Sequence, residues 1–143
     1  MSSASRERAR GLLIKALYQW QLAGHDQDEL LRQYADLAEF GRVDQAYFKD
    51  LLGRVLADAA NLDQVIARLA DRGVDQLDAV GRAILLLALA ELKFRDDVPV
   101  KVVINEAVNL AKRYGAAESF RFINAVADKA SRTLRAAPQA TSG

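Results

Sequence analysis

The last amphipathic segment of the chain carries an aromatic ring among charged side chains. Phe122 lies about a quarter-turn from the centre of the expected apolar stripe, on the side that also carries Glu118, Arg121 and Lys129. Proteins bind single-stranded RNA by stacking unpaired bases on aromatic or guanidinium planes, while cations contact the phosphates. This side is therefore a candidate RNA-binding site. The alternative is an aromatic ring at the edge of the core, covered by the aliphatic stems of long cationic side chains.

The first segment offers groups for the same chemistry. Arg6 and Arg10 are one helical turn apart, so their guanidinium groups could contact consecutive phosphates. Further along, Ile14, Tyr18 and Leu22 recur at four-residue spacing on the side opposite the expected core face. Tyr18 is accordingly a candidate contact for a nucleotide or a protein partner. Burial of this strip beneath another helix would explain the same pattern.

The charge of the chain is divided unevenly along its length. The formal net charge is only +1, but residues 1–24 hold four basic and one acidic residue, and residues 99–143 hold seven and three. Residues 25–98 hold nine basic and fifteen acidic residues. If the first and last segments pack side by side, their cations form one positive surface that can replace the counterions of a phosphate backbone.

Few residues are suited to catalysis or metal binding. The chain has no cysteine and one histidine, His25, which excludes thiol chemistry and cysteine zinc sites. Glu91 and Glu106 could be imagined as a catalytic pair, but no nucleophile or glycine-rich phosphate loop accompanies them. We therefore expect a binding protein with no catalytic residues, no cofactor and no metal site.

The elements that must position these groups are all predicted to be helical. The chain has two prolines and eight glycines in 143 residues, and its apolar residues recur at helical spacing. Seven helices are expected, at about 6–23, 26–41, 44–60, 61–73, 76–94, 99–115 and 118–134. The residues expected to begin helices include Ser5, Asp26, Asp44 and Asn61, and the glycines expected to end them are Gly24, Gly41, Gly73 and Gly115. Residues 83–90 are apolar all round, which predicts the central helix of a bundle. We expect one all-α domain over residues 1–136 and a disordered tail over 137–143.

The sequence also bears on location. The longest apolar run is far shorter than the roughly 20 residues that a membrane-spanning helix needs. The arginine-bearing start lacks the apolar stretch and cleavage site of a signal peptide. We expect a cytoplasmic protein that does not enter a membrane.

Several short motifs together resemble one known family. They are Arg-Glu-Arg-Ala-Arg at 6–10, Ala-Leu-Tyr-Gln-Trp-Gln at 16–21, Tyr-Phe-Lys-Asp-Leu-Leu at 47–52, Arg-Ala-Ile-Leu at 82–85, Ala-Glu-Leu at 90–92, Val-Pro-Val-Lys-Val-Val-Ile-Asn-Glu-Ala at 98–107 and Phe-Ile-Asn-Ala-Val at 122–126. Across residues 6–130 the chain resembles the NusB family of transcription antitermination factors. The resemblance implies a compact bundle of seven helices in two packed subdomains.

The resemblance also implies partners. Members of the family bind the boxA element of nascent RNA together with ribosomal protein S10 (NusE), join the elongating RNA polymerase and support transcription of ribosomal RNA operons. A homodimer is a further possibility that the sequence leaves open. The rival hypothesis is a protein-only helical scaffold that binds RNA incidentally.

Residue roles follow from the resemblance only position by position. Arg6, Arg8 and Arg10 match the basic start that contacts RNA in the family, and Phe122 with Glu118 match its second RNA-contacting segment. The S10-docking surface corresponds to central residues, here Asp75, Asp78 and Arg82. Phe120 and Arg121 depart from the family pattern, as does Glu7, so RNA affinity is expected to be weaker or differently tuned.

Overall fold

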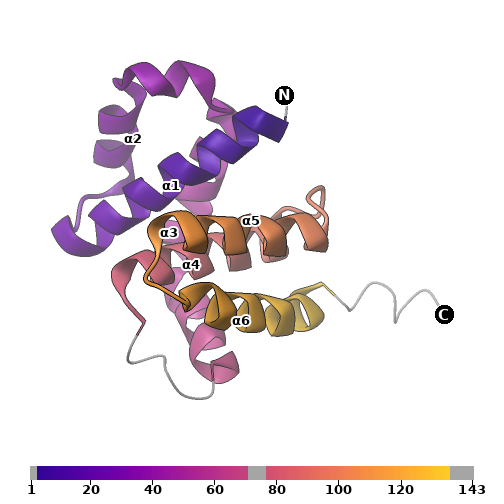
Figure 1. Ribbon diagram of the computed structural model, residues 1–143. Helices are drawn as coiled ribbons and strands as arrows, with labels where there is room; N and C mark the ends of the chain where they lie inside the picture. Colours follow the sequence, from indigo (N-terminus) through magenta and orange to yellow (C-terminus); the bar gives the residue numbers. More distant parts are fainter. Residues whose placement is uncertain (1–2, 71–76, 136–143) are drawn as a thin grey trace.

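The computed structural model describes residues 3–70 and 77–135, and all its regular elements are helices (Figure 1). In chain order they are α1 (Ser3–Ala23), α2 (Gln27–Ala35), the 3₁₀ helix η1 (Ala38–Arg42), α3 (Gln45–Leu69), α4 (Ala79–Phe94), α5 (Val100–Tyr114) and α6 (Ser119–Leu134). The all-α prediction is confirmed. Among the described residues, no helix combines the length and the apolar character needed to cross a membrane.

Helix α4 forms the centre of the molecule. Every residue from Ala83 to Leu92 is buried, and α4 packs against α1, α3, α5 and α6. An apolar side chain that becomes fully buried contributes about 1.5–3 kcal/mol, so this helix organises most of the hydrophobic core. The predicted central position of the apolar run is confirmed.

Side-chain caps set several of the helix boundaries as expected. Asp26 accepts a hydrogen bond from the Glu29 backbone N–H at 2.9 Å, and the Glu29 side chain accepts one from the backbone N–H of Asp26. This reciprocal capping box begins α2. Asp44 and Asp78 cap α3 and α4. Each side chain accepts a hydrogen bond from the backbone N–H three residues further along, that of Tyr47 and that of Gly81.

Two other expectations for the ends of α1 had different outcomes. Gly24, with φ of +71°, ends α1 in the left-handed conformation expected of a helix-terminating glycine. Ser5, predicted to be the N-cap of α1, instead lies inside the helix and is buried. Its carbonyl oxygen accepts a hydrogen bond from the backbone N–H of Asp44 at 3.0 Å, which fastens the first turn of α1 to the start of α3.

The predicted number of helices was wrong in two places. The third and fourth expected helices form one continuous helix, α3, because Ala57–Ala60 favours helix and the Asn61 amide bonds to Asp58 at 2.8 Å within the helix instead of capping a new one. The second expected helix divides into α2 and η1. The described residues thus form six α-helices and one 3₁₀ helix. The predicted boundaries at Gly73 and Gln76, and the predicted tail, lie outside the described residues.

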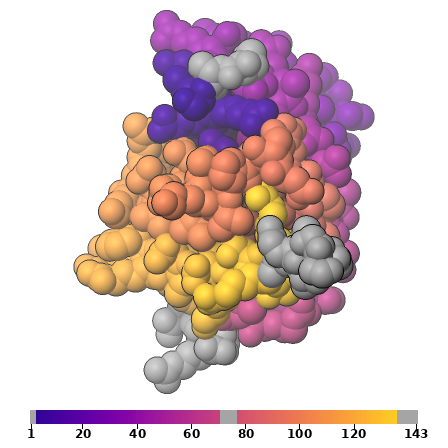
Figure 2. Space-filling model, turned by 90° about the vertical axis from the view of Figure 1, so that its right-hand side faces the viewer, coloured from indigo at the N-terminus to yellow at the C-terminus, as the bar shows by residue number. Residues whose placement is uncertain are grey.

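The first and last helices do not pack against each other as the charge argument required. The order across the molecule is α1, α5, α6, and the two views in Figures 1 and 2 agree on it. The main neighbours of α1 are α2, α3 and α4, whereas α6 packs on α4 and α5. Any positive surface that joins the two ends of the chain must therefore cross α5.

Candidate nucleic-acid interface

A pocket of about 430 Å³ opens on the surface where α1, η1 and the end of α5 meet. Charged residues dominate its walls. From α1 come Glu7, Arg8 and Lys15, from η1 come Glu39 and Arg42, and from the last turn of α5 come Arg113 and Tyr114. Segments more than a hundred residues apart in the sequence thus form one site.

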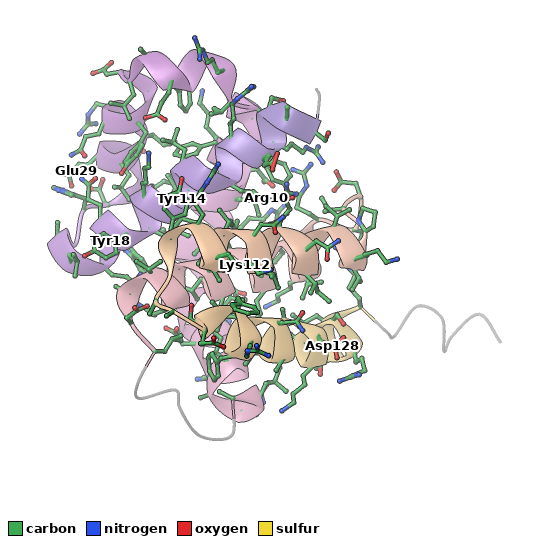
Figure 3. All side chains as sticks on the ribbon, viewed as in Figure 1. Arg10, Tyr18, Glu29, Lys112, Tyr114 and Asp128 are labelled. Carbon is green, nitrogen blue, oxygen red and sulfur yellow. The ribbon has the colours of Figure 1, made fainter. Side chains whose placement is uncertain are left out.

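Helical spacing explains how these groups share one wall. Arg8, Leu12 and Lys15 are separated by four and three residues, so they lie on one side of α1. Tyr114 reaches this side from α5, since a Cβ placed on Gly11 would lie 3.6 Å from the Tyr114 hydroxyl oxygen. Tyr114 keeps 38% of its surface exposed, and Figure 3 shows it beside α1.

The cations of this pocket form no ion pair with a carboxylate in the described part of the chain. Within residues 3–70 and 77–135, no ion pair involves Arg8, Lys15, Arg42 or Arg113. Arg113 instead lies over the Tyr114 ring, with its guanidinium carbon 5.9 Å from the ring centre. Four cations against two carboxylates make the pocket attractive to an anion.

Arg10 is not available for phosphate contact, which corrects the prediction made for it. Its side chain is only 4% exposed, and its Nη2 and Nε atoms donate to Glu91 Oε2 at 2.9 and 3.0 Å. The Tyr47 hydroxyl also bonds to Glu91, and Glu106 lies 3.8 Å from Arg10. Burial, reinforced by the Glu91 charge, raises the pKa of Tyr47 well above its usual value, so this hydroxyl stays protonated. Arg10 is an internal anchor between α1 and α4.

Arg6 remains at the surface but is already bonded to carboxylates. Its side chain is 30% exposed and lies 3.4 Å from Asp44 and 3.2 Å from Asp97. Arg6 also lies over the Tyr47 ring, 4.4 Å from its centre. The hydrogen bonds and charge of Arg95, with a smaller contribution from Arg6, lower the pKa of Asp97 to about 2. Contact between Arg6 and RNA stays a prediction, and it would require exchange of these carboxylates for phosphate.

The charged residues predicted around Phe122 are present, but they are arranged differently. Glu118 and Arg121 are exposed and form an ion pair at 2.6 Å. Arg121 lies over the ring of Phe120, 5.2 Å from its centre, and Lys112 of α5 approaches the same ring at 4.9 Å. Phe122 is half-buried at the edge of the core, and Lys129 donates to the Leu69 carbonyl oxygen. RNA contact by these residues stays a prediction.

A second surface surrounds the exposed end of α1. Ile14 is buried, but Tyr18 and Leu22 are 42% and 65% exposed, so only the later part of the predicted strip is a surface. It adjoins the start of α4, because Gln21 donates to the Ala79 carbonyl oxygen at 2.8 Å and accepts from Arg82 at 3.2 Å.

The predicted protein-docking residues of α4 lie at this second surface. Arg82 is held by Asp63 at 2.6 Å and lies over the Trp20 ring. Asp78 is exposed, although its carboxylate also caps α4 by accepting from Gly81 N–H at 2.7 Å. Asp75, the third predicted docking residue, lies outside the described residues. The later part of α1 and the start of α4, predicted separately, thus adjoin through Gln21.

Sequence reasoning missed Arg42, Arg113 and Tyr114. Arg42 fell in a segment expected to be the ordinary end of a helix, and no local pattern placed that segment beside α1. The only available signal was the Lys-Arg-Tyr sequence directly before the helix-ending Gly115. Two cations beside an aromatic residue at a helix end are a weak indication of nucleic-acid binding.

The fold and this site define an all-helical protein with a cation-rich surface pocket, and comparisons identify its family. The NusB family model matches residues 7–132. The transcription antitermination protein NusB of Yersinia enterocolitica is 46% identical over 135 residues, covering 94% of this chain and 98% of its own. That of Alcanivorax borkumensis is 46% identical over 132 residues, covering 92% and 88%. The chain belongs to the NusB family.

Solved structures share the fold. NusB from T. maritima superposes with a TM-score of 0.77 at 30% identity, over 89% of this chain and 90% of its own. A chain from a crystal structure of antitermination factors NusB and NusE with double-stranded RNA gives a TM-score of 0.76 at 24% identity, over 92% and 99%. NusB of Aquifex aeolicus, studied in solution, gives 0.72 at 28% identity, over 90% of each chain. The predicted family is thereby confirmed.

Proposed function

We propose that this protein is a transcription antitermination factor that binds boxA-type single-stranded RNA together with ribosomal protein S10, within the RNA polymerase elongation complex. Family membership supports antitermination, and the crystal structure of a NusB with NusE and double-stranded RNA supports RNA and NusE as the two kinds of partner. The observation that carries the proposal is the pocket between α1, η1 and α5, where four cations form no ion pair with any carboxylate in residues 3–70 and 77–135. The protein acts by binding and needs no catalytic step.

The RNA surface runs from this pocket to the start of α6. Arg8, Lys15, Arg42 and Arg113 supply the phosphate contacts, since each can replace a condensed counterion of the strand. Lys112 of α5 lies between the pocket and Phe120 of α6, where it approaches the ring. This path replaces the direct contact of α1 with α6 that the sequence led us to expect.

S10 occupies the surface formed by Tyr18, Leu22, Asp78 and Arg82. Large exposed apolar side chains beside charged ones are typical of protein interfaces, in which aromatic and arginine residues contribute most of the binding energy. The bonds of Gln21 to Ala79 and Arg82 hold the two helices in fixed relation, so the surface needs little ordering on binding. A second copy of the chain is the competing occupant.

Fluorescence anisotropy tests the RNA part of the proposal. A labelled boxA-like strand, a scrambled strand and a duplex are each titrated with the protein, with and without S10, at several salt concentrations. The proposal predicts preference for the boxA-like strand, loss of affinity with rising salt and tighter binding when S10 is present. Equal weak affinity for all three RNAs, unaffected by S10, contradicts it.

The exposed Tyr18–Leu22 surface also favours the rival hypothesis of a protein-only scaffold. The variant Arg8→Ala separates the two hypotheses, because this arginine is exposed, lines the pocket and has no ion-pair partner among the described residues. RNA binding through the pocket predicts that the slope of log affinity against log salt becomes shallower by about 0.7 for each lost phosphate contact. A scaffold predicts an unchanged slope and unchanged S10 binding.

A further inference from the structure

The pocket between α1, η1 and α5 has the volume of a small-ligand site. Its volume of about 430 Å³ lies within the roughly 300–1,000 Å³ of typical ligand pockets. Leu12 and Val43, both almost fully buried, give it an apolar lining. A flat phosphate-binding surface would need neither depth nor an apolar lining.

The groups around the pocket match the parts of a nucleotide. The exposed ring of Tyr114 supplies a stacking surface for a base, and Arg113 over this ring adds a cation at its face. Arg8, Arg42 and Lys15 line the pocket and can bind a phosphate. Glu7 and Glu39 can accept hydrogen bonds from a base amino group or a ribose hydroxyl.

We infer that the pocket takes one nucleotide of the bound RNA strand, whose base leaves the stack and lies against Tyr114 while its phosphates contact Arg8 and Arg42. This inference rests on the proposed RNA-binding function and gives it a specific subsite. The pocket thereby fixes the register of the strand on the protein, whereas the cations on α5 and α6 hold the rest of the strand without reading it.

Scanning the RNA with a fluorescent base tests the subsite. 2-Aminopurine is placed at successive positions of the boxA-like strand, and its fluorescence is recorded with the wild type and with Tyr114→Leu, Tyr114→Phe, Arg42→Ala and Arg32→Ala. Arg32 is an exposed cation on α2 outside the pocket, so Arg32→Ala matches the charge change of Arg42→Ala. Thermal unfolding of each variant confirms that the fold is kept.

One position is expected to change its fluorescence on binding, and the change should disappear in Tyr114→Leu but persist in Tyr114→Phe, which keeps the ring. The affinity of Tyr114→Leu should fall about 5- to 160-fold, as for the loss of one stacked base. Arg42→Ala should weaken binding and flatten its salt dependence more than Arg32→Ala does.

The contrary outcomes distinguish the subsite from the proposed function. If the wild type binds the strand but no position responds to Tyr114→Leu, or if Arg42→Ala matches Arg32→Ala, the subsite is refuted and RNA binding stands. If the wild type binds no RNA, both fail. If a free nucleoside monophosphate displaces the strand at equal concentration, the pocket belongs to a mononucleotide and not to an RNA segment.

Discussion

Arg10 and Arg8 show how two arginines of one helix turn acquire opposite roles. Arg10 bonds to Glu91, which is 81 residues away in sequence, and both side chains are buried. Arg8 is exposed and lines the pocket. Desolvating a charge costs several kcal/mol unless it is paired, so the position of Glu91 on α4 decides which arginine faces inward.

Removing Glu91 should therefore destabilise the protein strongly. Glu91→Ala leaves the Arg10 charge buried without its partner, and we expect the free energy of unfolding to fall by about 3–5 kcal/mol. Chemical denaturation measures this change. The control is Glu118→Ala, which breaks an exposed pair with Arg121 and should cost less than about 1 kcal/mol. Similar losses in the two variants would show that the buried pair contributes little.

Asp97 should make stability depend on acid pH. Its pKa is lowered to about 2 in the folded protein from an ordinary value of 3.8, chiefly by Arg95. Between these values the unfolded chain binds more protons than the folded one, so this contribution to stability is present above about pH 4 and is lost as pH falls toward 2. We expect Asp97→Asn to flatten the pH dependence of unfolding in this window. An unchanged profile would contradict the pairing.

At the scale of elements, the C-terminal end of α6 caps α4. The Arg135 guanidinium donates to the carbonyl oxygens of Leu92, Val98 and Arg95 at 2.8, 2.7 and 2.6 Å, and to that of Glu91 at 3.0 Å. These carbonyls belong to the end of α4 and the turn after it, and those of Glu91 and Arg95 also accept hydrogen bonds from the backbone N–H groups of Arg95 and Val98. Arg135 was counted from the sequence as part of a positive surface, but its side chain mainly stabilises the fold.

Arg135→Ala should accordingly lower stability, by about 1–3 kcal/mol, because buried carbonyl oxygens lose charged donors. Arg132→Ala is the matched control, since Arg132 is exposed and its ion pair with Asp128 lies within one helix. Urea denaturation of both variants measures the difference. Equal stability of the two variants would mean that water replaces the arginine without cost.

Phe122 lies at the edge of the hydrophobic core and Phe48 lies inside it, so their alanine variants can be compared. Phe48 is fully buried, so Phe48→Ala should cost about 3–5 kcal/mol of stability. Phe122→Ala should cost less and should weaken RNA binding, as expected of a half-buried ring beside charged residues. A stability loss equal to that of Phe48→Ala, with RNA affinity unchanged, would show that Phe122 serves only the core.

Sequence patterns predicted the helices better than they predicted the surfaces. Asp26, Asp44 and Gly24 act through neighbouring backbone, so their effect is local and visible in the sequence. The helix boundary predicted at Asn61 was wrong because an asparagine side chain can either cap a helix or form a hydrogen bond within one. The pocket required the approach of Arg42 and Tyr114 to α1, which depends on tertiary packing between distant segments.

At the scale of the whole molecule, the structure separates two surfaces. The pocket lies between α1, η1 and α5, and the Tyr18–Leu22 surface lies where the later part of α1 meets the start of α4. Both use α1, which is anchored to α4 through Arg10 and Glu91. Simultaneous binding of RNA and a protein partner is therefore sterically reasonable, because different parts of the helix are used.

Leu22→Asp should separate the two activities. A charge in place of an exposed leucine disrupts an apolar contact but leaves the core unaffected, so we expect S10 binding to weaken at least 10-fold, about 1.4 kcal/mol, with RNA binding alone unchanged. Calorimetry with S10 and anisotropy with RNA measure the two effects. If self-association is lost instead and S10 binding persists, the surface serves a homodimer.

We propose that RNA lies across α1, η1, the end of α5 and the start of α6. Backbone amide NMR shifts, followed while a boxA-like strand is added, locate the bound RNA directly. The largest changes are predicted at residues 7–15, 39–43 and 112–122. Changes confined to α2 and the exposed side of α3, with these segments undisturbed, would contradict it.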